Sequence, residues 1–460
     1  MKKLFLGLFA ALAALTLVGC GKTPAKSDSK YFHIMAWNEE FKGYFEKYVC
    51  DEKDQFMQAA EKKDDSLKPK TYHYDGKEVK WTIVPSEDGQ YQKALDLRLK
   101  ENENASDEER IDMFLAEADY ILKYSNSDYT TPIKDLGVSN LTNTYKYTSQ
   151  VASDSKGVVK GVSFQCCPAG VIYRRSIAKA VLGTDDPAQV QKKISSWSKF
   201  DAVAAEMKAK GYYMTSSYAE TYRAFSNNVT KPWVNDDEKL QFDSQIEAWM
   251  DQAERYIKNG YTMTHGIWEE GCTNEMFATG KTFCWFGPAW YYNFCMGSAQ
   301  DETKGCYGDW AVCEGPAYYY WGGTWLMGAA NGNDDYLVGK CMNSFINDLD
   351  VCKALVKNDG QFSNNQRANK EVAAEYEKEG TGNAFLGGQN DTKFYLDLAK
   401  RIKIKGMTIY DQYCNEGLQN AFGEYLKGIG KTDAEVKTKE QAIANFKTKL
   451  AINCPEIVFE

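Results

Sequence analysis

Residues 31–48 read YFHIMAWNEEFKGYFEKY, and this stretch decides the fold class. Its first part, Tyr31–Trp37, is a short and mostly apolar run of the length expected for a buried strand. The apolar residues then return with the spacing i, i+3, i+4 and i+7, which is typical of one face of a helix. These residues are Phe41, Tyr44, Phe45 and Tyr48. A strand that leads directly into a helix predicts an α/β protein.

The same alternation continues along the first part of the chain. The runs Val79–Val84 and Ile111–Leu115 have the composition of strands, and Pro85 ends the first of them. Between them, Gln90–Lys100 has the apolar spacing of a helix. Strands that alternate with helices predict a parallel sheet with helices on both of its faces.

The rest of the chain repeats this mixture of elements. Further strands are expected at Thr282–Phe286, Gly308–Val312 and Gly322–Ala329. A chain of 460 residues is too long for one ordinary domain of roughly 100–200 residues, so we expect two α/β lobes. Further helices are expected at Pro187–Lys193, Trp197–Lys210, Ile246–Asn259, Leu337–Asn347 and Asp348–Leu355, and in much of Phe394–Leu450.

Residues 1–20 have the features of a secretory signal peptide. Two lysines supply a positive start, residues 4–18 are mostly apolar, and a small glycine precedes Cys20. The ending LVGC resembles a bacterial lipobox, so we expect Cys20 to carry a lipid anchor. The polar residues 21–30, GKTPAKSDSK, are then a flexible tether. An uncleaved anchor and an ordinary signal with a chance cysteine are the alternatives.

Composition and charge limit the possible partners. The chain carries a formal net charge of −9 at pH 7, which argues against nucleic acid and anionic lipid as main partners. With 43% hydrophobic and 14% aromatic residues, the chain can form large cores. No run beyond the leader approaches the ~18 consecutive apolar residues that indicate a membrane-spanning helix. We therefore expect a body held at the membrane by the anchor alone.

Thirteen cysteines are many for an exported chain. A disulfide framework is the usual interpretation in an oxidising compartment. However, the spacing is scattered, no C-x-x-C motif occurs, and Cys166 and Cys167 are adjacent. Cys284 and Cys313 lie in apolar runs, where cysteine acts as a small buried hydrophobic residue. We favour mostly free thiols and an anaerobic or reducing habitat, with the disulfide framework as the alternative.

Signatures of catalysis and of metal binding are mostly absent from the sequence. The three histidines lie far apart, and no H-E-x-x-H, G-x-S-x-G or G-x-G-x-x-G motif occurs. Ala278–Thr282 resembles the end of a phosphate-binding loop, but Glu275 occupies the position of the glycine that the motif needs. We therefore expect no enzyme, no cofactor and no metal site. Glu39–Glu40, or Glu117 with Asp119, stays open as an acid–base pair.

Aromatic residues are the most informative set. The chain has 11 tryptophans and 30 tyrosines, and many lie at strand ends or in loops bounded by glycine and proline. Examples are Trp37, Trp285–Tyr292 and Tyr318–Trp325. Flat rings stack on the apolar C–H face of a sugar, while carboxylates and amides bind its hydroxyl rim. The set favours a carbohydrate-binding cleft, although any single ring could equally fill the core beneath its loop.

Several segments carry a family resemblance through their order along the chain. After the motif around Cys20 they are IMAWNEEF at 34–41, IDMFLAEADY at 111–120, QCCPAGVIYR at 165–174, FGPAW at 286–290, GDWAVCEGP at 308–316 and WGGTW at 321–325. In these segments the chain resembles the solute-binding lipoproteins of bacterial ABC importers, in the carbohydrate branch related to maltose-binding protein. The resemblance extends from the leader to the C-terminus.

The resemblance implies a periplasmic-binding-protein-like α/β fold, with two lobes, a hinge and a ligand cleft between the lobes. Each lobe is then discontinuous, the N-terminal one comprising 31–155 and 308–352 and the C-terminal one 156–307 and 353–460. The implied partners are a carbohydrate ligand and the permease subunits of an ABC transporter. We expect a monomer on the extracellular face of the membrane of a Gram-positive bacterium. By position, the cleft residues are Trp37, Asn38, Glu39, Glu87, Asp119, Gln165, Trp290, Trp321, Trp325 and Asn390.

Three functions compete on this evidence. The leading interpretation is a tethered receptor that captures a sugar or oligosaccharide and delivers it to a membrane permease, which needs no catalytic group. An exported glycoside hydrolase would use paired carboxylates and would turn its sugar over. A surface adhesion or scaffold protein would have no small-molecule cleft.

Overall fold

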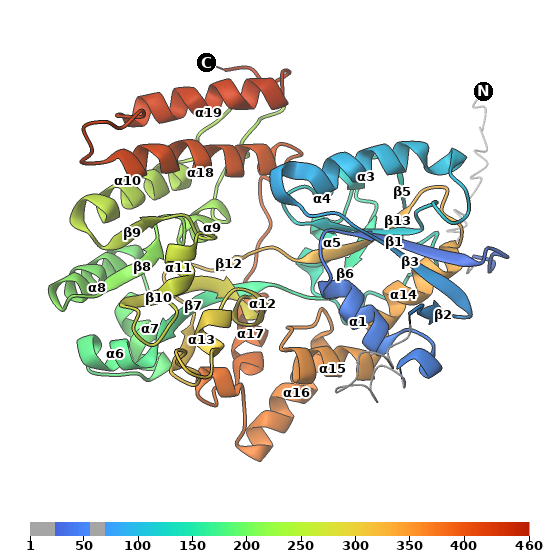
Figure 1. Ribbon diagram of the computed structural model, residues 1–460, viewed down its shortest axis with the longest axis horizontal. Coiled ribbons are helices and arrows are strands. Elements are labelled where there is room, and N and C mark those ends of the chain that lie inside the picture. Colours follow the sequence, from blue (N-terminus) through green and yellow to red (C-terminus); the bar gives the residue numbers. More distant parts are fainter. Residues whose placement is uncertain (1–23, 56–69, 460) are drawn as a thin grey trace, which may run out of the picture.

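The computed structural model describes residues 24–55 and 70–459, which form two halves, each built around a sheet (Figure 1). The predicted signal peptide with Cys20 and the first residues of the predicted tether lie outside the described residues. Within the described parts of the chain, no helix has the length and apolar character needed to cross a bilayer.

One half is built on a seven-stranded sheet. In sheet order its strands are β2 (His73–Tyr74), β3 (Lys77–Ile83), β1 (Tyr31–Ala36), β4 (Met113–Glu117), β13 (Thr324–Ala329) and β5 (Thr130–Thr131), with β6 (Gly161–Ser163) also paired to β13. β1 runs parallel to β3 and β4, as the sequence predicts. β13 runs antiparallel to β4, because it enters from the other half beside Glu117, at the end where β4 stops.

Helices pack on this sheet and build cores on both of its faces (Figure 1). β1 shows how the sequence sets the two faces, since side chains alternate along a strand. Phe32 and Ile34 join the core that contains Phe41. Met35 joins the core that contains Leu95 on the opposite face. The helices are α1 (Glu40–Tyr48), α3 (Gln90–Glu101), α4 (Ile121–Ser125), α5 (Lys146–Val151), α14 (Asp335–Asn347) and α15 (Leu349–Asp359), with the 3-10 helices η2 (Glu87–Gly89) and η3 (Asn102–Asn104).

The other half is built on a six-stranded sheet. In sheet order its strands are β11 (Trp310–Cys313), β7 (Pro168–Arg174), β10 (Thr282–Pro288), β8 (Tyr213–Ser217) and β9 (Thr262–His265), with β12 (Tyr319–Tyr320) also paired to β7. β7 runs antiparallel to its neighbours β10 and β11, whereas β10, β8 and β9 are parallel. All seven residues of β7 are buried, as expected for a central strand covered on both faces.

Local signals set the helices of this half. The side chain of Ser196 caps α8 (Trp197–Ala209) by accepting a hydrogen bond from the backbone N–H of Lys199, and Gly260 ends α10 (Ser244–Asn259) with a left-handed φ of 65°. α10 shares a separate core with α9 (Tyr222–Ser226), α18 (Asp411–Gly428) and α19 (Lys439–Asn453). The remaining helices are α6 (Arg175–Leu182), α7 (Pro187–Ile194), α11 (Glu270–Asn274), α12 (Ala289–Phe294), α13 (Gly297–Gln300), α16 (Gln366–Glu379), α17 (Asp391–Ala399) and η4 (Ala384–Leu386).

The chain passes between the two sheets at two neighbouring places. It leaves the first sheet after β6 and enters the second at β7, so residues 164–167 cross. It returns from β12 to β13 through residues 321–323. Gln165 forms an isolated antiparallel bridge with Ser363, which adds a third segment at the junction.

Two of the predicted lobe boundaries do not coincide with these crossings. The resemblance places residues 156–307 in the C-terminal lobe, yet β6 within that range pairs with β13 of the first sheet. It places residues 308–352 in the N-terminal lobe, yet β11 within that range pairs with β7 of the second sheet. The sequence pattern locates a strand but does not state its pairing partner, which depends on contacts far apart in the chain.

All 12 cysteines in the described parts of the chain are free thiols, and only Cys295 and Cys306 are not fully buried. Cys284 and Cys313 lie in the core of the second half, where they act as small apolar side chains. Burial raises the pKa of both thiols. These groups are therefore neutral and poorly reactive in the folded protein.

Candidate functional site

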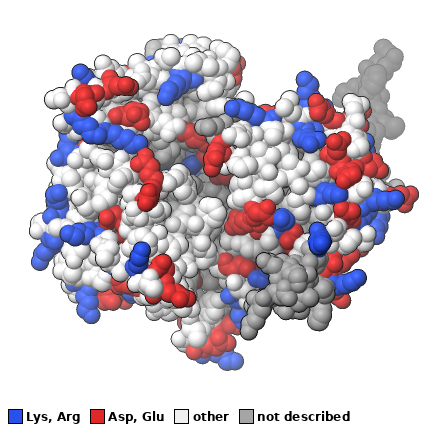
Figure 2. Space-filling model, in the orientation of Figure 1, with Lys and Arg blue, Asp and Glu red and all other residues white. Residues whose placement is uncertain are grey.

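A cleft of about 910 Å³ lies between the two halves, and its lining includes Trp37 of the first half and Tyr218 of the second. Figure 2 shows the depression between the halves, with acidic side chains on both of its sides. Small-molecule sites typically have volumes of about 300–1,000 Å³. The cleft is therefore large enough for a ligand of one to several sugar rings.

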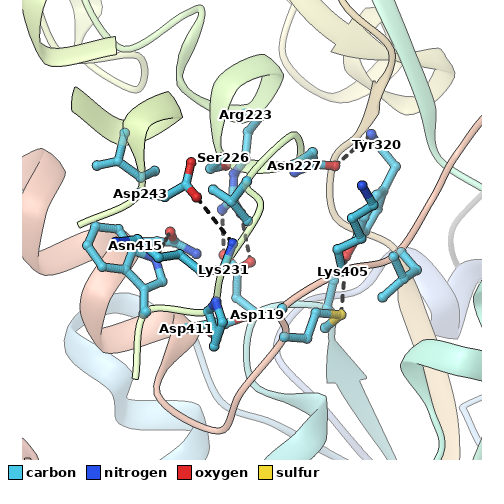
Figure 3. Close-up of a pocket in the computed structure, with 18 of the residues that line it drawn as sticks. Asp119, Arg223, Ser226, Asn227, Lys231, Asp243, Tyr320, Lys405, Asp411 and Asn415 are labelled. Atoms are coloured by element: carbon cyan, nitrogen blue, oxygen red, sulfur yellow. Dashed lines mark hydrogen bonds and ion pairs between the residues drawn. The ribbon is translucent and has the colours of Figure 1, made fainter. Parts of the chain in front are cut away.

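A second, much smaller cavity adjoins the cleft and shares some of its lining residues (Figure 3). Its volume is about 50 Å³, which is room for a few water molecules only. The two cavities share Asp119 and Arg223, which face each other in Figure 3 and are joined by dashed lines. We assign the ligand site to the large cleft on the grounds of volume.

Six of the ten residues predicted from the sequence line the cleft. Most of them follow the ends of strands, where the fold of an open α/β sheet forms its crevice. Trp37 and Asn38 follow β1, Asp119 follows β4, and Gln165 lies in the crossing between the sheets. The six are Trp37, Asn38, Asp119, Gln165, Trp290 and Trp321.

Trp325 and Asn390 do not line the cleft. Trp325 is 1% exposed in the core, and its indole N–H donates to the carbonyl of Thr148 over 2.9 Å. The alternation of side chains along β13 turns this ring inward. Asn390 caps α17, because its side chain accepts a hydrogen bond from the backbone N–H of Lys393 over 3.0 Å. The sequence prediction is wrong about where both residues lie.

Glu39 and Glu87 also lie outside the cleft. Glu39 is exposed and pairs with Lys42 over 2.6 Å, while its neighbour Glu40 lines the cleft. Glu39 is the N-cap residue and Glu40 the first residue of α1, and successive side chains of a helix differ in direction by about 100°, so the two neighbours point to different surroundings. Glu87 is exposed in η2, and Ser86 beside it lines the cleft instead.

Tryptophan rings form one wall of the cleft. The ring centroids of Trp290 and Trp321 are 5.3 Å apart, and those of Trp268 and Trp321 are 5.8 Å apart. The indole N–H of Trp290 donates to the carbonyl of Trp321 over 3.2 Å, which fixes the orientation of the Trp290 ring. Trp268 is 62% exposed at the rim. Sequence analysis missed Trp268, which sits alone in the sequence without a motif.

An ion pair crosses the cleft from one half to the other. Arg223 of α9 donates from Nη1 to Oδ1 of Asp119 over 2.7 Å, and its Nη2 bonds the other carboxylate oxygen. The guanidinium also lies 6.0 Å from the ring centroid of Trp321. Two parallel hydrogen bonds between arginine and a carboxylate are the strongest form of this contact. Sequence analysis missed Arg223, because its partner lies in the other half.

Two further carboxyl groups of the cleft have pKa values above the ordinary value of a glutamate. Burial raises the pKa of Glu40 to about 7, with Tyr44 and Gln361 as its hydrogen-bond donors. Burial raises the pKa of Glu117 as well, and the charge of Asp119 adds to the rise. Sequence analysis considered Glu40 and Glu117 only as hydrolase carboxylates. Desolvation favours the neutral form of a carboxyl group until a positive charge comes near.

Glu220 is a third carboxyl in the cleft wall that sequence analysis missed. It is 2% exposed, and burial raises its pKa to about 8. One of its oxygens accepts from the backbone N–H of Phe286 over 3.0 Å, and the other accepts from the hydroxyl of Ser216 over 3.2 Å. Both carboxyl oxygens are thus hydrogen-bonded, and Glu220 connects β10 with β8 in the cleft wall.

Two observations bear on metal binding and acid–base chemistry in the site. The described residues hold no group of three or more His, Cys, Asp or Glu side chains arranged to bind a metal ion. Of the carboxyl pair Glu117 and Asp119, the second is occupied by Arg223. An acid–base pair needs both carboxyl groups free to reach the substrate.

A two-sheet α/β chain with crossing segments and a cleft between its halves defines a periplasmic-binding-protein-like protein. The family model described as "Bacterial extracellular solute-binding protein" matches residues 70–379, which is more than half of the chain. The chain therefore belongs to this family, whose members are binding proteins. No sequence among curated proteins matches the chain.

Solved structures agree with the fold. A crystal structure described as "Extracellular solute-binding protein family 1" is 17% identical, with a TM-score of 0.70 over 91% of this chain and 99% of that chain. The ABC-transporter-associated binding protein from B. animalis subsp. lactis Bl-04 in complex with β-1,6-galactobiose is 15% identical, with a TM-score of 0.64 over 94% and 100%. Maltose-bound MalE3 from T. maritima is 12% identical, with a TM-score of 0.61 over 92% and 99%.

Proposed function

We propose that this chain is a membrane-tethered binding protein that captures a sugar or oligosaccharide and delivers it to the permease subunits of an ABC transporter. The observation that carries the proposal is the cleft of about 910 Å³ with Trp37, Trp290 and Trp321 in its walls. Membership of the solute-binding family supports the transport role. The similar structures bound to galactobiose and to maltose support the choice of ligand class.

The proposed contacts follow from the chemistry of a sugar ring. Its C–H face is apolar, so it gains free energy by leaving water and stacking on an indole such as Trp290. Its hydroxyl groups lose hydrogen bonds to water and need partners in the cleft. The amide of Gln165, held by a 3.4 Å hydrogen bond from Nε2 to the hydroxyl of Thr324, offers its oxygen for this purpose. Closure about residues 164–167 and 321–323 would bring both halves onto one ligand.

The proposal includes a lipid anchor on Cys20 and a monomeric protein on the extracellular face of a Gram-positive cell membrane. One acyl chain holds a protein weakly and two hold it stably, and a diacylglycerol supplies two. The variant Cys20→Ala is expected to lose incorporation of labelled lipid and to stay unprocessed. Undiminished label in that variant would contradict the anchor.

The ligand proposal is tested by a thermal-shift screen over mono- and oligosaccharides, followed by calorimetry on each hit. Trp290→Ala is expected to weaken binding by roughly 1–3 kcal/mol, comparable to the loss of one buried apolar side chain. Trp290→Phe keeps an aromatic face and is expected to retain most of the affinity. Scattering measures whether the radius of gyration falls with ligand.

Two results would count against the receptor. Equal affinity of Trp290→Ala and the unaltered protein, with no decrease in the radius of gyration on adding ligand, would contradict the proposal that the ligand binds in the cleft. Release of a cleaved sugar from any hit would indicate a glycoside hydrolase, so product analysis accompanies the screen.

A further inference from the structure

The charges that line the cleft are unbalanced. The lining contains seven carboxyl side chains and three cationic ones. Arg223 is occupied by Asp119, and Lys427 is paired with Glu269 over 2.8 Å. The third cation, Lys449, is exposed on α19. The carboxyl side chains are Glu40, Glu117, Asp119, Glu220, Glu269, Glu416 and Glu424.

Glu117 presents an open oxygen to the cleft. Its Oε2 accepts from the backbone N–H of Asp119 over 2.8 Å, and within the described residues its Oε1 accepts no hydrogen bond. A Cβ built on Gly322 would lie 3.5 Å from this Oε1 and 3.5 Å from the indole of Trp290. The absence of a side chain at Gly322 thus leaves an atom-sized space that touches a carboxylate oxygen and an aromatic ring.

Glu40 lines the same cleft as Glu117. Its Oε1 accepts from Gln361 over 3.3 Å, and its Oε2 has no hydrogen-bond donor among the described residues. Burial raises the pKa of the Cys167 thiol at the crossing between the sheets, and the charges of Glu40 and Glu117 add to that rise. Two carboxyl groups with open oxygens therefore line the same cleft.

We propose that the ligand is an amino sugar, a carbohydrate that carries a free protonated amine, and that Glu117 and Glu40 receive this amine. The inference rests on the proposed function and narrows its ligand class. A neutral sugar supplies no counter-charge, so desolvation in the closed cleft would hold both carboxyl groups in their neutral form. An ammonium group supplies that charge and donates up to three hydrogen bonds to the open oxygens.

Calorimetry with matched sugars tests the proposal on the unaltered protein. The probes are glucosamine, galactosamine and the β-1,4-linked glucosamine disaccharide, each beside its N-acetylated form and its hydroxyl parent. In any set that binds, the amine is expected to bind roughly 10-fold or more tightly than its counterparts, because a charge-assisted hydrogen bond is stronger than a neutral one. Equal or tighter binding of the neutral counterpart would overturn the inference.

Variants locate the amine within the cleft. Glu117→Gln and Glu40→Gln keep the size of the side chain and remove its charge, so each is expected to abolish most of the preference for the amine. Burial already favours the neutral form of Glu40, so the glutamine variant is expected to fold, and thermal melting checks this. Glu39→Gln is the matched control next to Glu40, exposed and outside the cleft, and is expected to keep the preference. An unchanged preference in both cleft variants would overturn the assignment.

The outcomes separate this inference from the proposed function. If only neutral sugars bind, the receptor stands and the amino-sugar inference fails. Spermidine is included as an amine without a sugar body. If spermidine binds and no sugar does, the carbohydrate receptor and the amino-sugar inference both fail.

Discussion

At the scale of single residues, the contact between Asp119 and Arg223 joins the two halves of the molecule. The partners lie 104 positions apart in sequence, and the side chains are only 13% and 18% exposed. Removing one partner of a buried pair leaves the other charge desolvated and unpaired. The pair therefore stabilises the approach of the halves only while both members are present.

Arg223→Gln is expected to lower the free energy of unfolding by about 1–3 kcal/mol, because the Asp119 carboxylate loses its partner within a partly buried site. The measurement is urea unfolding followed by circular dichroism. Lys42→Gln removes the exposed pair with Glu39 and serves as the control, with an expected change of about 0–1 kcal/mol. Equal effects of the two variants would contradict the structural role of Arg223.

These residues also show how far the sequence predicts the site. Trp37 and Asp119 were predictable, because each follows a recognisable strand and the ends of such strands form the crevice. Trp325 was predicted wrongly, since its motif does not reveal which face of β13 turns inward. Arg223 could not be predicted at all, because its role depends on a carboxylate in the other half. Glu40 lines the cleft in place of the predicted Glu39, its neighbour in the sequence.

At the scale of elements, β7 is the strand on which the second sheet depends. It pairs with β10, β11 and β12, and Gly170 is its third residue. A Cβ on Gly170 would come within 2.7 Å of the carbonyl oxygen of Cys313 on β11. Backbone cannot move aside as a flexible side chain can. The strands were predictable from apolar runs. The close approach of Gly170 to β11 was not, because it depends on which strands pair.

Gly170→Ala is expected to destabilise the protein by about 1–3 kcal/mol, the usual cost of overpacking a core. Gly43→Ala is the matched control, since Gly43 is exposed in α1 and a Cβ there would meet nothing within 4 Å. This control is expected to stabilise the protein by about 0.5–1 kcal/mol through helix propensity. Chemical denaturation of both variants gives the two values, and a stabilising Gly170→Ala would refute the predicted clash.

At the scale of the whole molecule, buried carboxyl groups link stability to pH. Burial raises the pKa of Glu40, Asp112 and Asp411 to about 7 and that of Glu220 to about 8. Their ordinary values near 4 apply in the unfolded chain. The folded state thus holds these protons more tightly, so the associated stability is present at low pH and is lost as the pH rises through about 7–8.

The melting temperature is therefore expected to fall by a few degrees between about pH 6.5 and about pH 8.5. Burial lowers the pKa of His33 from its ordinary value of 6.5 to about 4. This residue therefore lowers stability only below about pH 6.5 and does not affect the comparison between the two pH values. Scanning calorimetry at both pH values measures the change. Glu40→Gln is expected to reduce the difference and Glu39→Gln to leave it unchanged. A melting temperature that rises across this window would disprove the linkage.

The order of strands in the first sheet has a consequence for biosynthesis. β13 lies between β4 and β5, although it begins only at residue 324. A ribosome that has made the first 160 or so residues has thus produced a sheet with an empty central position, which exposes unpaired backbone groups. The N-terminal half cannot mature until most of the chain has been translated. A nascent chain whose folding is delayed in this way stays unfolded for longer. An unfolded chain can pass through a narrow export channel, whereas a folded one cannot.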